Sequence, residues 1–150
     1  MESVAIYSSL TPHRDVRRLP VPALPPAVRY AGVLAVAAGI AYFSLTGDPP
    51  AQPSGNDKTL HFVAYATLGL AIAYATLDDR RPLVRAALIV GGAGLYGVGI
   101  ELVQWPLPER YFGLGDIVAN LFGGVLALSW LVVERVFTYV PVPEGVSDGT

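Results

Sequence analysis

Four long apolar runs constrain the fold of this chain more than any other feature. They cover residues 30–47, 59–77, 86–105 and 117–133, with lengths of 18, 19, 20 and 17 residues. The first run has no charged residue, and none of the others has more than one. A helix needs about 20 apolar residues to cross a bilayer, within a range of roughly 17 to 25. The sequence therefore predicts an all-α, polytopic membrane protein with four transmembrane helices in a compact bundle.

The composition agrees with this prediction. Hydrophobic residues make up 53% of the 150 residues and charged residues only 15%, whereas an ordinary soluble domain is about 25% charged. A chain of this size has too little interior to hide so much apolar surface from water. The alternative, a soluble helical protein with a very apolar core, does not account for the lengths of the runs. The first run also exceeds the roughly 7 to 15 apolar residues of a signal peptide, so we expect it to be retained as a span.

The segments that flank the runs predict three regions. Residues 1–27 contain five prolines and are expected to form an irregular cytoplasmic segment. Residues 28–137 are expected to form the transmembrane domain, and residues 138–150 a disordered tail. Cysteine is absent, which excludes disulfides and thiolate metal sites.

The distribution of basic residues predicts the orientation in the cell membrane. One side of the predicted membrane carries eight arginines, namely Arg14, Arg17, Arg18, Arg29, Arg80, Arg81, Arg85 and Arg135, and the other side carries only Lys58 and Arg110. Cytoplasmic loops are enriched in Lys and Arg. We therefore expect both termini in the cytoplasm, with the connections at residues 48–58 and 106–116 outside.

The polar residues of the runs gather at the outer ends of the second, third and fourth helices. Helical spacing places Asp57, His61, Tyr65 and Gly69 on one face of the second helix, Gly94, Gly97, Glu101 and Gln104 on one face of the third, and Asp116, Asn120, Gly123 and Ala127 on one face of the fourth. Small residues allow membrane helices to approach closely. We expect these three faces to pack together, with a polar pocket at the outer end and close packing beneath it.

At these residues the chain resembles the VanZ-like family of membrane proteins. The resemblance is carried by "DKTLHFVAY" at 57–65, "ELVQ" at 101–104, the "PER" that ends at Arg110, and "DIVANLFGG" at 116–124. It covers about half of the chain. The family takes its name from a protein linked to resistance to the glycopeptide teicoplanin. The resemblance implies the fold, a polar site at these motifs and, by likeness only, a connection with antibiotic resistance.

Each polar residue also has a purely structural interpretation. Asp116 and Asp57 can act as N-caps of their helices. Glu101 and Arg110 can form an interfacial ion pair, which contributes only about 0 to 1 kcal/mol when exposed. Asn120 can bridge two helices by a hydrogen bond worth about 0.6 kcal/mol. His61 can be a buried histidine that bonds to a neighbouring side chain. It also lies about one turn inside an apolar helix, where an ionisable residue is by default a functional candidate.

Three kinds of chemistry fit this set of residues. The first is binding of an anionic or sugar-bearing envelope molecule, membrane lipid or glycopeptide, in which Lys58 and Arg110 hold the anion. We expect the remaining ligand contacts from the residues Asp57, Tyr65, Gln104 and Asn120. The second is an enzyme, a hydrolase or transferase, in which His61 acts as a general base with Glu101 or Asp116. A helical scaffold or transporter component is a further alternative.

The third kind of chemistry is metal binding. The oxygen and imidazole groups of Asp57, His61, Glu101 and Asp116 suit several divalent ions, but two nearby cations weaken that interpretation. We therefore assign no metal residue and expect no cofactor. No basic cluster on a soluble face suggests nucleic acid, and the predicted partner is a membrane lipid or a cell-envelope molecule.

Overall fold

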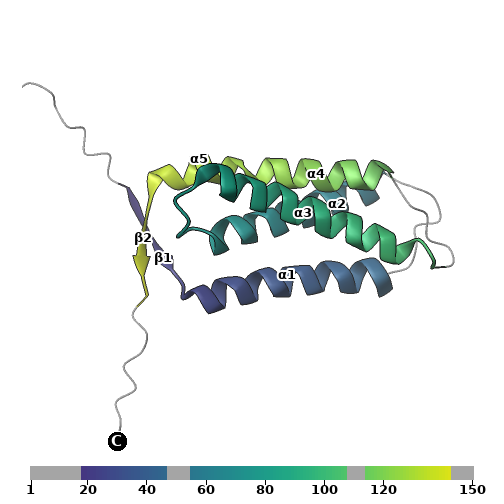
Figure 1. The fold of residues 1–150 in the computed structure, drawn as a ribbon, viewed down its shortest axis with the longest axis horizontal. Coiled ribbons are helices and arrows are strands. Elements are labelled where there is room, and N and C mark those ends of the chain that lie inside the picture. Colours follow the sequence, from purple (N-terminus) through teal and green to yellow (C-terminus); the bar gives the residue numbers. More distant parts are fainter. Residues whose placement is uncertain (1–17, 47–54, 108–113, 143–150) are drawn as a thin grey trace, which may run out of the picture.

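The computed structural model describes residues 18–46, 55–107 and 114–142, which form mostly helices. Figure 1 shows the order of the elements along the chain. The helices are α1 (Pro26–Thr46), α2 (Gly55–Ala75), α3 (Pro82–Gln104), α4 (Leu114–Ala127) and α5 (Ser129–Val133), followed by a 3-10 helix (Glu134–Val136). The strands are β1 (Leu19–Ala23) and β2 (Phe137–Pro141). The prediction of a helical fold is confirmed.

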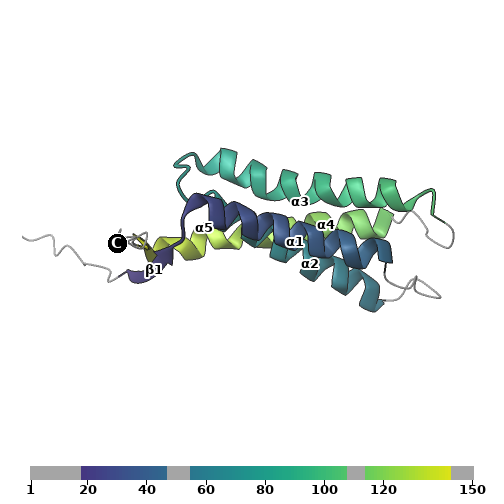
Figure 2. The same cartoon turned by 90° about the horizontal axis from the view of Figure 1, so that it is seen from below.

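The long helices lie side by side, and α2 contacts α1, α3 and α4 (Figures 1 and 2). We call the end that carries β1 and β2 the strand end, and the end where α1 and α3 finish and α2 and α4 begin the His61 end. Because α2 is surrounded by neighbours on several sides, its buried residues outnumber those of α1. This central place explains why Tyr65 of α2 is only 1% exposed.

The fourth helical stretch continues from α4 into α5 with one local irregularity at Leu128. The backbone N–H of Leu128 bonds to the carbonyl of Val125, three residues earlier, at 3.0 Å. Such a bond tightens one turn of a helix without ending it. Leu114–Val136 therefore serves as one helix of 23 residues.

Three helices of the described chain are long and apolar enough to cross a membrane: Pro26–Thr46, Pro82–Gln104 and Leu114–Val136. Large apolar side chains are exposed on all three, including Phe43, Leu95 and Phe122. An exposed apolar surface of this extent requires a lipid or protein environment. The sequence also predicted a span at residues 59–77, but α2 is not among the three, since Lys58 and His61 in its first turns lower its hydropathy.

Glycines allow the closest contacts between the helices. A Cβ atom on Gly123 of α4 would lie 2.5 Å from the carbonyl oxygen of Phe62 and 2.7 Å from the amide nitrogen of Ala66, both on α2. A Cβ atom on Gly69 would lie 2.6 Å from the side chain of Ala127. The prediction that the small-residue faces of these helices pack against each other is confirmed by these contacts.

The two strands were not predicted from the sequence. They lie on the two flanks of the helices, in segments that were expected to be irregular or disordered. Leu19–Ala23 lies in the segment expected to be irregular, and most of Phe137–Pro141 lies in the tail expected to be disordered; they pair in parallel. Ala23 accepts a hydrogen bond from the amide of Val142. Bonding positions alternate along a strand, so Pro20 and Pro22 turn their nitrogen atoms away from β2, as prolines in edge strands do.

Candidate functional site

His61 lies one turn into α2 and faces α4. Its Nδ1 atom is 3.2 Å from Oδ1 of Asn120, and this hydrogen bond joins the two helices. Asn120 is only 1% exposed, whereas His61 is half-buried. An amide oxygen can only accept a hydrogen bond. In the tautomer that carries its proton on Nδ1, His61 donates this hydrogen bond to Asn120.

Two carboxylates from the other helices lie beside this histidine. Glu101, in the last turn of α3, is 1% exposed, and Asp116 stands in the first turn of α4. One ligand atom from each of His61, Glu101 and Asp116 lies within 4.8 Å of the other two. His61, Glu101 and Asp116, which lie far apart in the sequence and belong to three helices, are thus brought together at the His61 end.

Close packing holds Asn120 in its position. A Cβ atom on Gly97 of α3 would lie 2.6 Å from Nδ2 of Asn120 and 3.1 Å from its Cβ. Gly97 is one turn before Glu101 on the same face of α3. The small residue therefore admits the amide that contacts His61, and a larger residue at this position would push it aside.

Lys58 lies at the edge of the same group. Its side chain is exposed, and a Cβ atom on Gly115 would lie 3.4 Å from its Nζ atom. Gly115 directly precedes Asp116 at the start of α4. The ammonium group is therefore available to an anion that approaches the His61 end from outside the helices.

Tyr65 and Gln104, which were predicted to contact a ligand, are both buried. Tyr65 is 1% exposed, and its ring lies parallel to that of His61 with a centroid separation of 6.3 Å. Gln104 donates from Nε2 to the backbone carbonyl of Ser44 at 2.7 Å, which ties α3 to α1. Asp57 and Arg110 were also predicted to contact a ligand, but the side chain of Asp57 and the whole of Arg110 lie outside the described residues.

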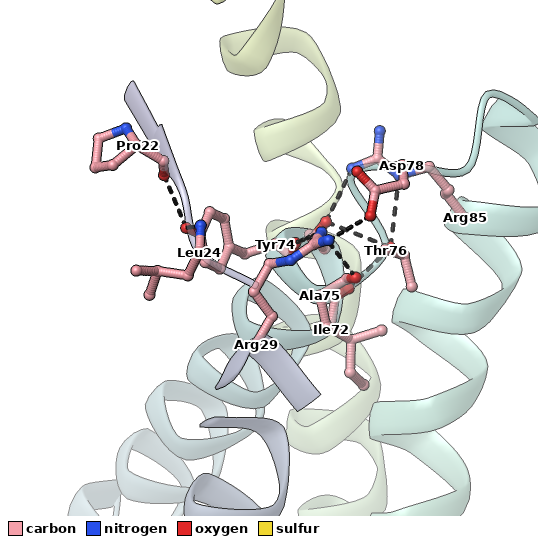
Figure 3. A network of polar contacts seen from close by, with 10 residues as sticks. Pro22, Leu24, Arg29, Ile72, Tyr74, Ala75, Thr76, Asp78 and Arg85 are labelled. Carbon is pink, nitrogen blue, oxygen red and sulfur yellow. Dashed lines mark hydrogen bonds and ion pairs between the residues drawn. The ribbon is translucent and has the colours of Figure 1, made fainter. Parts of the chain in front are cut away.

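A second polar cluster, which was not predicted from the sequence, lies at the strand end of α2 (Figure 3). Arg29 of α1 donates to the carbonyls of Tyr74 and Ala75 at 3.3 and 3.2 Å and pairs with Asp78. Arg85 of α3 donates to the carbonyl of Ala73 at 2.9 Å. The last carbonyls of a helix have no partner within it, so the two arginines satisfy them.

The same cluster connects the 3-10 helix and the segment around β1 to the long helices. Arg85 also pairs with Glu134 of the 3-10 helix, with a distance of 2.9 Å between Nη2 and Oε2. The hydroxyl of Tyr74 accepts a bond from the amide of Leu24 and donates one to the carbonyl of Pro22, at 3.1 and 2.9 Å. The signal in the sequence was the position of Arg29 and Arg85 inside helices, because a charge that lies within a helix needs a partner.

The polar groups at the strand end and at the His61 end can form different interactions. At the strand end, the guanidinium groups of Arg29 and Arg85 can only donate hydrogen bonds, and they donate them to carbonyls and carboxylates. At the His61 end, the imidazole and the two carboxylates can accept protons, hydrogen bonds or a divalent cation. The His61 end is therefore the candidate functional site.

Comparison with known proteins gives one relative. The chain is 41% identical over 83 residues to an uncharacterized protein of Schizosaccharomyces pombe. The matched region is 55% of this chain and 51% of the relative, so the chain spans about half the length of the curated relative it matches. No family model and no solved structure matches the chain.

Proposed function

We propose that this chain is a membrane protein with four spans in a compact bundle, and that its His61 end binds an anionic or sugar-bearing molecule of the membrane or cell envelope. The observation that carries the proposal is the convergence of His61, Glu101 and Asp116 from three helices within 4.8 Å. Ionisable groups within membrane helices are costly and are kept where they serve a function. The likeness of the motifs to VanZ-like proteins supports the same assignment.

The pairing of the strands supports a fourth crossing by α2. Three crossings would leave the two flanks of the helical region on opposite sides of a membrane, but β1 precedes α1 and β2 follows α5, and the two strands are paired. An even number of crossings fits this pairing. With 21 residues and a rise of about 1.5 Å per residue, α2 is roughly 30 Å long, which matches the hydrocarbon core of a bilayer.

The orientation follows from the basic residues of the sequence. Eight arginines belong to the strand end or the segments that adjoin it, whereas only Lys58 and Arg110 belong to the other side. Since basic residues are enriched in cytoplasmic segments, the strand end faces the cytoplasm and the His61 end faces outward. A ligand would then reach the site from the outer headgroup layer or from the cell envelope.

The ligand class follows from the groups present. Lys58 is exposed beside the start of α4, and the N-terminus of a helix favours negative charge. A phosphate or carboxylate oxygen of a headgroup can therefore bind at Lys58. The carboxylates of Glu101 and Asp116 can accept hydrogen bonds from hydroxyl groups of a sugar or glycerol.

Lipid binding by the purified protein tests this proposal. In native mass spectrometry we expect the protein to retain phosphatidylglycerol in preference to phosphatidylcholine. Lys58→Ala should abolish this preference, and Lys58→Arg should weaken it, since a wide planar guanidinium does not replace a compact ammonium in a restricted space. Equal retention of both lipids by the wild-type protein would contradict the proposal for lipid headgroups.

A second candidate function is catalysis, which the position of the histidine favours. His61 is oriented by Asn120 at 3.2 Å and lies beside two carboxylates. Such a histidine can serve as a general base toward water or a substrate hydroxyl. Turnover of the bound lipid that is lost in His61→Ala would support an enzyme, and binding without turnover would support a binding protein.

A further inference from the structure

We propose that His61, Glu101 and Asp116 hold one divalent cation. Their ligand atoms lie within 4.8 Å of one another. Tetrahedral ligands at metal distances of about 2.1 Å are roughly 3.4 Å apart, so shifts of about an ångström in the side chains bring the three atoms around one ion. Because each residue belongs to a different helix, the ion would tie α2, α3 and α4 together at the His61 end.

The hydrogen bond to Asn120 supports this assignment independently. A histidine that binds a metal usually donates its other ring N–H to a carbonyl or carboxylate, which fixes the tautomer and the ring orientation. His61 has this arrangement, since Nδ1 lies 3.2 Å from Oδ1 of a fully buried asparagine. Gly97 leaves room for that asparagine. In the tautomer that donates from Nδ1, the ion would bind at Nε2.

The charges and the donor atoms indicate which ions fit. Two carboxylates balance the charge of a divalent cation, and one of them, Glu101, is only 1% exposed. The site offers one imidazole and two carboxylates, and the chain has no cysteine. This donor set suits Zn²⁺ or Mn²⁺ and disfavours Cu⁺, which prefers sulfur.

Lys58 is compatible with such an ion. Lys58 is exposed beside Gly115, whereas Glu101, one of the three proposed ligands, is buried. Together the ammonium and the ion would hold two oxygens of one phosphate or carboxylate group. This joint role rests on the proposed function, while binding of the ion itself does not.

Equilibrium dialysis of the full chain tests the proposal. The protein is stripped with a chelator in uncharged detergent and dialysed against Mn²⁺ or Zn²⁺, and the bound metal is measured by mass spectrometry. We expect one ion per chain, with affinity lowered at least about tenfold in Glu101→Gln and in Asp116→Asn and about 10- to 100-fold in Asn120→Ala. Asp79→Asn, which removes a carboxylate at the strand end, should bind like the wild type.

Co²⁺ gives a second readout that reports on the ligands themselves. The visible absorption of the Co²⁺-loaded protein should change in His61→Gln, since a nitrogen ligand is lost. Circular dichroism and gel filtration identify the variants that are folded. Absence of stoichiometric binding, or unchanged binding in folded Glu101→Gln and Asp116→Asn, would overturn the proposal. Retention of phosphatidylglycerol by a protein that binds no ion would overturn this inference and leave the proposed function standing.

Discussion

At the scale of single residues, Gly123 has the least space of the glycines that the structure describes. A Cβ atom there would come within 2.7 Å of two backbone atoms of α2, which cannot move without shifting the helix. We predict that Gly123→Ala lowers the free energy of unfolding by about 1 to 3 kcal/mol, as overpacking does. Thermal unfolding in detergent, followed by circular dichroism, measures the change.

Gly91 provides the matched control for this substitution. It lies in the interior of α3, and a Cβ atom there would meet nothing within 4 Å. Gly91→Ala should leave stability unchanged or raise it by about 0.5 to 1 kcal/mol, because alanine is the better helix former. Equal losses of stability in the two variants would contradict the packing that we describe.

A pH dependence is expected at Asp79, in the turn between α2 and α3. Hydrogen bonds from the side chain and the backbone of Arg81 lower the pKa of Asp79 to about 2. A lowered pKa means that the ionised form stabilises the fold above the unfolded pKa of 3.8 and that this contribution is lost as the pH falls toward 2. The effect is small, since the pair is exposed to solvent.

The pH dependence of unfolding checks this expectation. We predict that the melting temperature of the wild-type protein falls more steeply as the pH is lowered from 3.8 to about 2, the two pKa values of Asp79, than that of Asp79→Asn, which has no carboxyl group to titrate. Parallel curves for the two proteins would show that the contact between Asp79 and Arg81 does not contribute to the stability of the folded protein.

The sequence predicts some of these residue-level features because helical periodicity is a local property. Spacing by three or four residues placed His61, Glu101 and Asp116 on faces that meet, and the small residues below them on the same faces. Periodicity cannot tell which partner a side chain selects. It could not indicate, for example, that the amide of Gln104 donates a hydrogen bond to the carbonyl of Ser44 on α1.

At the scale of elements, the ends of the helices are stabilised by long-range contacts. Arg85 of α3 binds the carbonyl of Ala73 and pairs with Glu134, and both side chains are largely buried. Arg85→Leu would remove the partner of a buried carboxylate, and we predict a loss of about 3 kcal/mol in the free energy of unfolding. The double variant Arg85→Leu, Glu134→Leu should recover part of this loss.

Chemical unfolding of the two single variants and the double variant measures the coupling between Arg85 and Glu134. A coupling energy near zero would mean that the pair contributes nothing beyond its separate contacts. The sequence could not reveal this pair, since its members are 49 residues apart. The strands were not predicted for a similar reason, since β1 pairs with a segment more than 100 residues away. The prolines of β1 also argued against a strand there.

At the scale of the whole molecule, the two flanks of the helical region lie at one end, and we expect that end in the cytoplasm. The chain has no cysteine, so single cysteines can be introduced at will. An impermeant thiol reagent applied to intact cells should label Gly55→Cys and fail to label Arg80→Cys, which becomes reactive after permeabilisation. The opposite pattern would place the His61 end in the cytoplasm.

The central claim is that His61, Glu101 and Asp116 form a binding site and do not merely hold the helices together. The most direct measurement compares ligand retention and thermal unfolding in one preparation of wild-type protein and Glu101→Gln, a substitution that conserves shape and removes charge. We predict that Glu101→Gln loses its preference for phosphatidylglycerol while its melting temperature stays close to that of the wild type. A variant that keeps the preference and melts at a clearly lower temperature would contradict the account and assign Glu101 to packing alone.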